Sequence, residues 1–205
     1  MKIARFLLWF FKPLFWLVFP YKTYNKERIP TVSKEKPLIV CSNHISMIDP
    51  VYLLMTVKPY VYFMSKDELF RNRFSAWFLG KIMGAFPVRR GSGDTKAIDT
   101  AKEIVSSGRI LGIYPEGTRS KDGTLLRAKS GAALIVSQTG ADVLPVAVVT
   151  KNQKNKVFRP YKIIFGEPIS AKELHLDNPE SPDLRYASRM IMEKIGGLMQ
   201  EHTEE

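Results

Sequence analysis

Apolar residues gather into short, nearly continuous runs that recur along most of the chain. Residues 38–41, 109–114 and 143–149 are such runs, and apolar segments of this length are typical of strands buried on both faces of a sheet. Residues 60–64, rich in Val, Tyr and Phe, predict a further strand. Pro145 lies inside one of the runs, which predicts an edge strand, a strand start or a bulge at that point.

Between these runs, apolar residues recur at the spacing of a helix. Asp94 predicts a capped helix that ends before Gly108, and residues 131–139 predict a second helix. A last helix opens at Ser181 and carries apolar residues three and four positions apart. Because predicted strands and helices alternate, we expect an α/β fold, with a mostly parallel or mixed sheet flanked by helices in a single domain over residues 31–205.

The first part of the chain has a different pattern. Residues 1–30 contain six basic residues and one acidic residue, and residues 1–21 contain eight aromatic side chains. Aromatic rings and cations together favour the headgroup layer of a lipid bilayer. We therefore expect residues 1–30 to form a membrane-anchoring segment of two short amphipathic helices interrupted at Pro13. A tilted membrane-spanning helix and a helix packed on the protein's own core are the alternatives.

The overall composition narrows the class of protein. Of 205 residues, 45% are hydrophobic and 25% charged, which is typical of a globular chain and excludes a disordered or collagen-like one. The 31 basic and 20 acidic residues give a net charge of +11. No zinc-finger, RNP or basic-zipper pattern accompanies this charge, so we expect no nucleic-acid partner. The single cysteine excludes an internal disulfide framework and a multi-cysteine metal site.

The first motif that carries chemistry directly follows the apolar run at residues 38–41. Ligands of an open α/β sheet gather outside the carboxyl ends of its strands, which is where His44 is expected. His44 and Asp49 would lie about 140° apart on a continuous helix, so they can meet only if the helix begins near Asp49. Asp49 would then also cap that helix, with Pro50 in its first turn. A histidine oriented by an aspartate is a general base. A buried loop histidine beside a capping aspartate is the alternative.

Three further segments suit the binding of an anion. Residues 84–91 end a predicted strand in two arginines that include Arg90, and the planar guanidinium group matches phosphate. Residues 114–120 follow the next strand, and Gly117 lets a ligand approach the backbone closely. Lys129 precedes a predicted helix start, where a cation assists the helix N-terminus in holding phosphate. Each segment taken alone is equally typical of an ordinary surface turn.

Taken together and in order, these motifs resemble those of the glycerolipid acyltransferases, the family of 1-acylglycerol-3-phosphate acyltransferases. The resemblance covers about residues 21–170, and it departs from the family pattern at Arg89, where many relatives carry an acid, and at Tyr114, which replaces a common Phe. The matching blocks are His44 and Asp49 for H-x-x-x-x-D, Phe86-Pro87-Val88-Arg89-Arg90 for F-P-V-x-R, Glu116-Gly117-Thr118-Arg119-Ser120 for E-G-T-R-S, and Leu144-Pro145-Val146-Ala147 for the hydrophobic proline block.

The resemblance implies an acyl-group transferase of phospholipid biosynthesis. The acyl group would pass from a thioester, on acyl-CoA or acyl carrier protein, to the sn-2 hydroxyl of lysophosphatidate, giving phosphatidate. His44 would be the general base and Asp49 its orienting partner, with backbone N–H groups near His44 as candidate oxyanion donors. No metal and no cofactor besides the acyl donor is implied.

The resemblance also assigns roles to the remaining motif residues. Glu116 either bonds a glycerol hydroxyl or braces its loop, and these two roles stay open. The expected assignments are Arg90, Arg119 and Lys129 for the acceptor phosphate, Glu116, Gly117 and Thr118 for the substrate-binding loop, and Phe86, Pro87, Val88 and Pro145 for the acyl site or its structural support.

Location and alternative functions follow from the same observations. We expect a protein on the cytoplasmic face of the cell membrane, monotopic or peripheral, whose partners are lysophosphatidate, the acyl thioester and the lipid surface. A related lyso-lipid or glycerol-3-phosphate acyltransferase would share the motifs. A non-catalytic lipid-binding module and a membrane-attached nucleic-acid binder are the alternatives from other classes.

Overall fold

The computed structural model describes residues 2–89, 94–150, 158–176 and 179–203. Its centre is a seven-stranded sheet with the order β1-β7-β6-β2-β5-β3-β4. β6 and β7 pair antiparallel, and the other neighbouring strands pair parallel. The expected α/β fold with a mostly parallel, mixed sheet is therefore confirmed. The strands are β1 (Tyr21–Tyr24), β2 (Leu38–Ser42), β3 (Val61–Lys66), β4 (Ala85–Val88), β5 (Ile110–Ile113), β6 (Asp142–Thr150) and β7 (Tyr161–Phe165).

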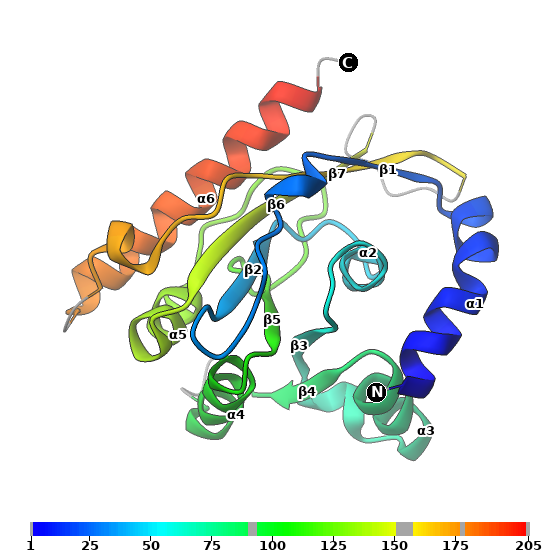
Figure 1. Ribbon diagram of the computed structural model, residues 1–205, viewed down its shortest axis with the longest axis horizontal. Helices are drawn as coiled ribbons and strands as arrows, with labels where there is room; N and C mark the ends of the chain where they lie inside the picture. Colours follow the sequence, from blue (N-terminus) through cyan, green and yellow to red (C-terminus); the bar gives the residue numbers. More distant parts are fainter. Residues whose placement is uncertain (1, 90–93, 151–157, 177–178, 204–205) are drawn as a thin grey trace.

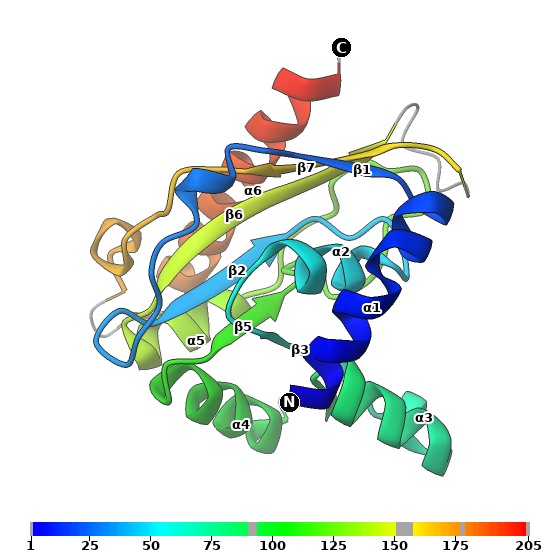
Figure 2. The same ribbon diagram turned by 45° about the vertical axis from the view of Figure 1, so that its right-hand side comes forward.

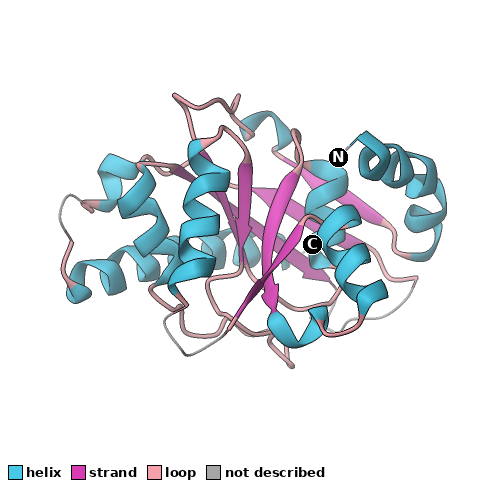
Figure 3. Cartoon of the chain, turned by 90° about the horizontal axis from the view of Figure 1, so that it is seen from below, coloured by secondary structure: helices cyan, strands magenta, loops and turns pink. Residues whose placement is uncertain are grey.

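Helices cover both faces of this sheet (Figures 1 and 3). One face carries α4 (Thr95–Ser106), α5 (Gly131–Thr139) and α6 (Ser181–Thr203), whose buried alanines, isoleucines and valines pack in one apolar cluster with the central strands. The other face carries α1 (Lys2–Val18) and α2 (Asp49–Thr56), which belong to a second cluster. Shorter elements are α3 (Arg73–Trp77), the π-helical turn η3 (Phe78–Ile82) and the 3-10 turns η1 (Lys26–Arg28), η2 (Asp67–Phe70) and η5 (Ala171–Leu174).

The sheet begins earlier in the chain than the sequence predicted. β1 pairs in parallel with β7, from Tyr21↔Tyr161 to Tyr24↔Ile164. Arg28 then donates to the carbonyl of Phe165 and pairs with Glu167 at 2.7 Å. The expected boundary at residue 30 is therefore wrong, because residues 21–28 belong to the α/β unit. The strand was not predicted because residues 21–28 are aromatic and basic, like the helix before them.

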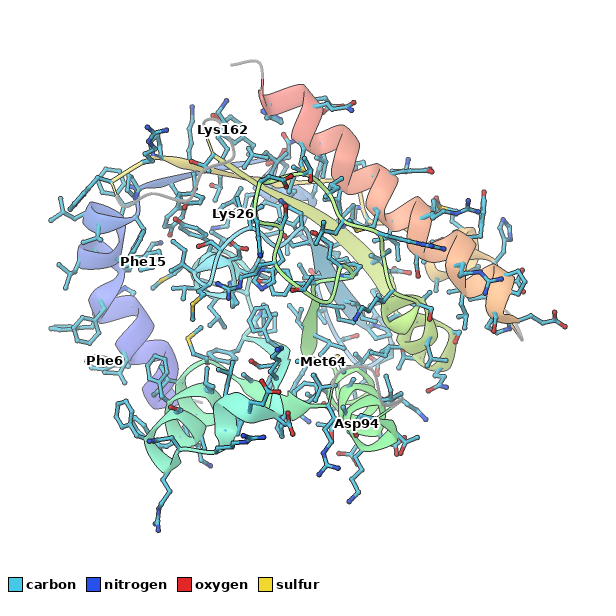
Figure 4. The ribbon with its side chains drawn as sticks, turned by 180° about the vertical axis from the view of Figure 1, so that it is seen from behind. Phe6, Phe15, Lys26, Met64, Asp94 and Lys162 are labelled. Carbon is cyan, nitrogen blue, oxygen red and sulfur yellow. The ribbon has the colours of Figure 1, made fainter. Side chains whose placement is uncertain are left out.

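α1 is one helix and not two. It runs through Pro13, where the missing N–H removes a single intrahelical hydrogen bond while the turns on both sides remain. Its C-terminal half packs on the protein, because Phe15 lies 5.5 Å from Tyr52 of α2 between ring centroids, and Figure 4 shows Phe15 on that side of the helix. Its other rings are exposed: Phe6, Trp9, Phe10, Phe11 and Trp16. The expected break at Pro13 is therefore wrong.

A second group of exposed aromatic side chains lies near the N-terminal end of α1. Phe74 and Trp77 of α3 and the following Phe78 are exposed, and η3 contacts α1 (Figure 2). None of the helices among the described residues combines the length and the apolarity that crossing a bilayer requires. We call the exposed rings of α1 and of residues 74–78 the aromatic surface.

Pro145 lies in a central strand, between β2 and β7, and not at an edge. It aligns with Cys41 of β2, whereas pairing with β7 begins only at the next residue, Val146. The missing proline N–H therefore costs no ladder hydrogen bond with β7. The prediction of an edge or a strand start is wrong, but the bulge is present: Val146 pairs with Phe165 and Val143 with Ile169, so the segment after β7 carries one extra residue opposite Pro145.

The carboxyl ends of β2 and β5 position the loops that carry the predicted site residues. β2 and β5 are parallel neighbours, from Ile39↔Leu111 to Cys41↔Ile113. Their carboxyl ends therefore lie side by side at the same edge of the sheet, and the loops that follow them meet there.

Candidate active site

His44 lies in the loop that connects β2 to α2. Its Nδ1 lies 2.8 Å from Oδ2 of Asp49, whose side chain is fully buried. Because α2 begins at Asp49, the loop folds back and brings together two residues that a continuous helix would hold apart. The spacing predicted this pairing. With Nδ1 facing the carboxylate, the opposite nitrogen, Nε2, is the acceptor in the neutral ring.

Asp49 organises the loop as well as the imidazole. Its Oδ2 also accepts the backbone N–H groups of Ile45 at 2.8 Å and Ser46 at 2.7 Å. These bonds stabilise the ionised carboxylate in a buried setting. The N-cap position of α2 is Ile48, so the prediction that Asp49 caps the helix is wrong. Its side chain points back into the loop instead of along the helix start.

Three backbone donors of the His44 loop already form hydrogen bonds within the protein. The His44 N–H donates to Glu116 at 2.9 Å, and those of Ile45 and Ser46 donate to Asp49. These three groups are therefore not free to bind an oxyanion, which removes them from the candidate donors that the sequence offered near His44.

The unpaired side of His44 faces a cavity. Nε2 forms no hydrogen bond with any described residue, and the ring lines a cavity of about 320 Å³, which we call the His44 cavity. Thr118 and Arg119 contribute to its wall, so the structure brings the histidine and one predicted phosphate ligand together. The apolar part of the wall consists of Met47, Pro50, Phe63, Met64, Leu69, Leu79, Met83 and Ala85.

Tyr114, directly after β5, packs against one face of the His44 imidazole. Its ring lies 4.1 Å from the His44 ring between centroids at an angle of 19°, and Phe63 stacks on Tyr114 in turn at 6.1 Å. Burial raises the pKa of Tyr114 well above its usual value, and the charge of Asp49 raises it further, so the phenol stays neutral. The stack limits rotation of the histidine ring.

Glu116 fixes the position of the His44 backbone. It is buried, and its Oε1 accepts the His44 N–H while its Oε2 accepts the Leu126 N–H at 3.2 Å. Burial raises its pKa, although the two backbone bonds act in the opposite direction. In addition, Ser120 donates its N–H to the His44 carbonyl at 2.8 Å. Of the two roles left open by the sequence, this geometry favours bracing of the loop over contact with substrate.

Gly117 brings Lys129 close to the same loop. Its φ is +70°, and an added Cβ would lie 3.0 Å from Cδ and Cε of Lys129. Lys129 does not line the His44 cavity. It lines a second cavity of about 570 Å³ between α4 and α5, which we call the α4–α5 cavity. Met64 and Tyr114 line both cavities, so the two meet at these side chains.

The other predicted site residues are dispersed. Arg90 lies outside the described residues. Val88 lines the α4–α5 cavity, and Phe86 packs against the core, while Pro87 is exposed on β4. Pro145 is buried in β6 and lines neither cavity.

One structural residue of the site was not assigned a role from the sequence. The Asn43 side chain donates to the Val148 carbonyl at 2.9 Å and accepts the Val148 N–H at 2.7 Å, which ties the end of β2 to β6. The position of Asn43, between a buried strand and the histidine, could have indicated this structural role. No group of three or more metal-ligating side chains occurs among the described residues.

The sequence of this chain is similar to those of known proteins. The Acyltransferase family matches residues 21–149. The 1-acyl-sn-glycerol-3-phosphate acyltransferase of Bacillus subtilis is 32% identical over 78% of this chain and 79% of its own length. The enzyme of the same name from Streptococcus pneumoniae is 30% identical over 77% of this chain, which spans only 58% of that relative. A lyso-ornithine lipid O-acyltransferase of Pseudomonas aeruginosa is 33% identical over 59% of this chain and 46% of its own length.

A solved structure shares the fold. The crystal structure of the 1-acyl-sn-glycerophosphate acyltransferase PlsC from Thermotoga maritima matches with a TM-score of 0.69 and 26% identity, over 96% of this chain and 79% of that one. The family match includes the whole His44 loop and the Glu116 loop, which the structure holds together at the ends of β2 and β5. The chain therefore belongs to the Acyltransferase family.

Proposed function

We propose that this protein transfers an acyl group from an acyl thioester to the sn-2 hydroxyl of 1-acylglycerol-3-phosphate, as the names of its relatives suggest. One observation carries the proposal: the Asp49-bound imidazole of His44 shares a cavity with the cation of Arg119. A general base and a phosphate ligand on one cavity match an acceptor that carries a hydroxyl and a phosphate.

The reaction needs one proton to move twice. Nε2 of His44 takes the proton of the acceptor hydroxyl as its oxygen attacks the thioester carbonyl. Asp49 stabilises the imidazolium that forms. As the tetrahedral intermediate collapses, the C–S bond breaks and the imidazolium returns the proton to the departing thiolate. No cofactor enters these steps, because the base comes from the chain and the nucleophile from the acceptor.

An acyl-transfer assay tests the function. Purified protein is incubated with lysophosphatidate, glycerol-3-phosphate or a lyso-ornithine lipid, each with acyl-CoA and with acyl carrier protein as donor. We expect the highest kcat/KM with lysophosphatidate. Transfer to the lyso-ornithine lipid alone would replace the acceptor in this proposal, and thioester turnover with no acceptor would contradict it.

Arg119→Ala is expected to raise the KM for lysophosphatidate about ten- to a hundredfold, because a charge-assisted bond to phosphate is lost. The KM for the acyl donor should change little. Steady-state kinetics with each substrate varied in turn measure both values. Lys121→Ala, two residues along the same loop and outside the His44 cavity, is the control. An equal loss for donor and acceptor would argue against a phosphate role.

We also propose that the aromatic surface rests in the headgroup layer of the membrane. Trp9 and Phe10 of α1 are 71% and 59% exposed, which leaves a large apolar area without protein cover. Lys12 lies on the same helix and suits anionic lipid. Single-chain lipids stay largely in the bilayer, so an enzyme seated there takes its acceptor directly from the membrane.

Replacing Phe6, Trp9 and Phe10 together by serine is expected to reduce binding to anionic vesicles at least about a hundredfold, since each buried ring contributes about 1.5 kcal/mol or more. Co-sedimentation with vesicles of known phosphatidylglycerol content measures this. Tyr186→Ser, an exposed ring on α6, is the control. Undiminished sedimentation of the triple variant would refute membrane binding through α1.

A further inference from the structure

Four cationic side chains converge away from the His44 cavity. Arg127 and Lys129 come from the segment before α5, and Arg185 and Arg189 lie one turn apart on α6. Together they line a cavity of about 660 Å³, which we call the arginine cavity. Its other walls are formed by Ala128, Ser130 and Pro182, so no described carboxylate lines it.

These charges have no partners among the described residues. None of the four cations forms an ion pair with a described carboxylate. Glu193 lines only the adjoining groove, which shares Arg127 and Arg189 with the arginine cavity. Like charges gathered in one recess repel each other, and a bound polyanion removes that repulsion.

The arginine cavity adjoins a second cavity, which in turn adjoins the His44 cavity. It shares Lys129 and Ser130 with the α4–α5 cavity. The α4–α5 cavity shares Tyr114 with the His44 cavity, and Tyr114 stacks on the imidazole. Met64 and Asp94, which are labelled in Figure 4, both line the α4–α5 cavity. A long ligand that followed this row of adjoining cavities would place one end near His44 and its anionic end among the arginines.

We propose that the arginine cavity binds the phosphate groups of the acyl donor, namely the diphosphate and the ribose phosphate of coenzyme A. This proposal rests on the proposed function, because that reaction requires a thioester donor. The linking arm between thioester and phosphates would occupy the α4–α5 cavity, whose walls include Ile98, Leu134 and Ile135. Arg185 and Arg189 lie outside residues 21–149, so the family motifs assign them no role.

The size and position of the cavity favour a nucleotide over a carrier protein. A recess of several hundred Å³ is typical of sites for small molecules, whereas a protein docks on a broad surface of about 800 Å². The recess also lies at α6, on the opposite side of the molecule from α1 (Figure 1). The donor would thus enter from water while the acceptor enters from the aromatic surface.

The test is an Arg185→Gln/Arg189→Gln double variant of the full chain. Its KM for acyl-CoA should rise at least about tenfold, with kcat and the KM for the acceptor little changed. With the same acyl group on N-acetylcysteamine, a thioester that has no phosphate, the variant should equal the wild type. Lys194→Gln, an exposed cation of α6 outside the cavity, is the matched control.

Calorimetry with coenzyme A separates this proposal from the proposed function. The double variant should lose coenzyme A affinity at least about tenfold, whether or not any acceptor is acylated. Equal losses with both thioesters, or unchanged coenzyme A affinity, would overturn the proposal. A loss of activity seen only with acyl carrier protein as donor would also overturn the proposal. It would indicate that the arginine cavity contacts the carrier protein. If no acceptor is acylated but the affinity difference persists, the phosphate site stands and the proposed reaction fails.

Discussion

Replacing His44 by alanine is expected to lower kcat by about a thousandfold or more, because the reaction loses its general base. The fold should be unaffected, since the imidazole fills a cavity wall and the loop is held by backbone bonds to Asp49 and Glu116. The measurement is kcat with saturating lysophosphatidate and acyl-CoA, together with circular dichroism and vesicle binding to verify that the protein is intact.

Two further variants make this result specific. Asp49→Asn retains the volume of the side chain but cannot stabilise an imidazolium in the same way, so kcat should fall strongly with little change in KM. His175→Asn alters an exposed histidine at a left-handed position that asparagine tolerates, and it should behave as wild type. Retention of more than about a tenth of the activity by His44→Ala would be incompatible with general-base catalysis at that residue.

The second large effect is expected at Glu116, and it combines stability with activity. Glu116→Ala leaves the buried N–H groups of His44 and Leu126 without an acceptor, which should lower the free energy of unfolding by about 2–4 kcal/mol. Because one of these groups belongs to His44, kcat should fall about a hundredfold as the imidazole loses its fixed position. Urea denaturation and steady-state kinetics measure the two quantities.

The outcome distinguishes the two roles that the sequence left open for Glu116. A brace predicts lower stability and lower kcat with an almost unchanged KM for the acceptor. A ligand of the glycerol hydroxyl predicts the reverse, a higher KM with unchanged stability. Glu103→Ala, which removes an exposed carboxylate of α4, is the control for the loss of charge alone.

Local patterns were sufficient for the central strands, for the helices after residue 94 and for the histidine–aspartate pair. The helix over 131–139 and the cap by Asp94 depend on neighbouring residues, and the structure confirms both. His44 and Asp49 are five residues apart, and they can pair only when the residues between them form a loop. These predictions succeed because every group involved lies within a few residues along the chain.

Contacts between distant segments were not accessible in the same way. Glu116 bonds a backbone 72 residues earlier, and that contact depends on the register of β2 against β5. The sequence could not choose among the alternatives for Pro145, because the bulge lies in a partner segment after Phe165, whose register against β6 no local pattern shows. Residues 21–28 were assigned to the wrong unit because composition does not reveal which distant strand they pair with.

The junction between α1 and β1 has a mechanical consequence. Only Phe19 and Pro20 separate the helix from the strand, and the Pro20 and Val18 carbonyls accept N–H groups from Tyr161 and Phe158. α1 is thus joined to the sheet by a short hydrogen-bonded connection and not by a flexible linker. If α1 lies among lipids, as proposed above, the tilt of the whole protein and the height of His44 over the bilayer would be set together, and the base would meet glycerol hydroxyls at a single depth.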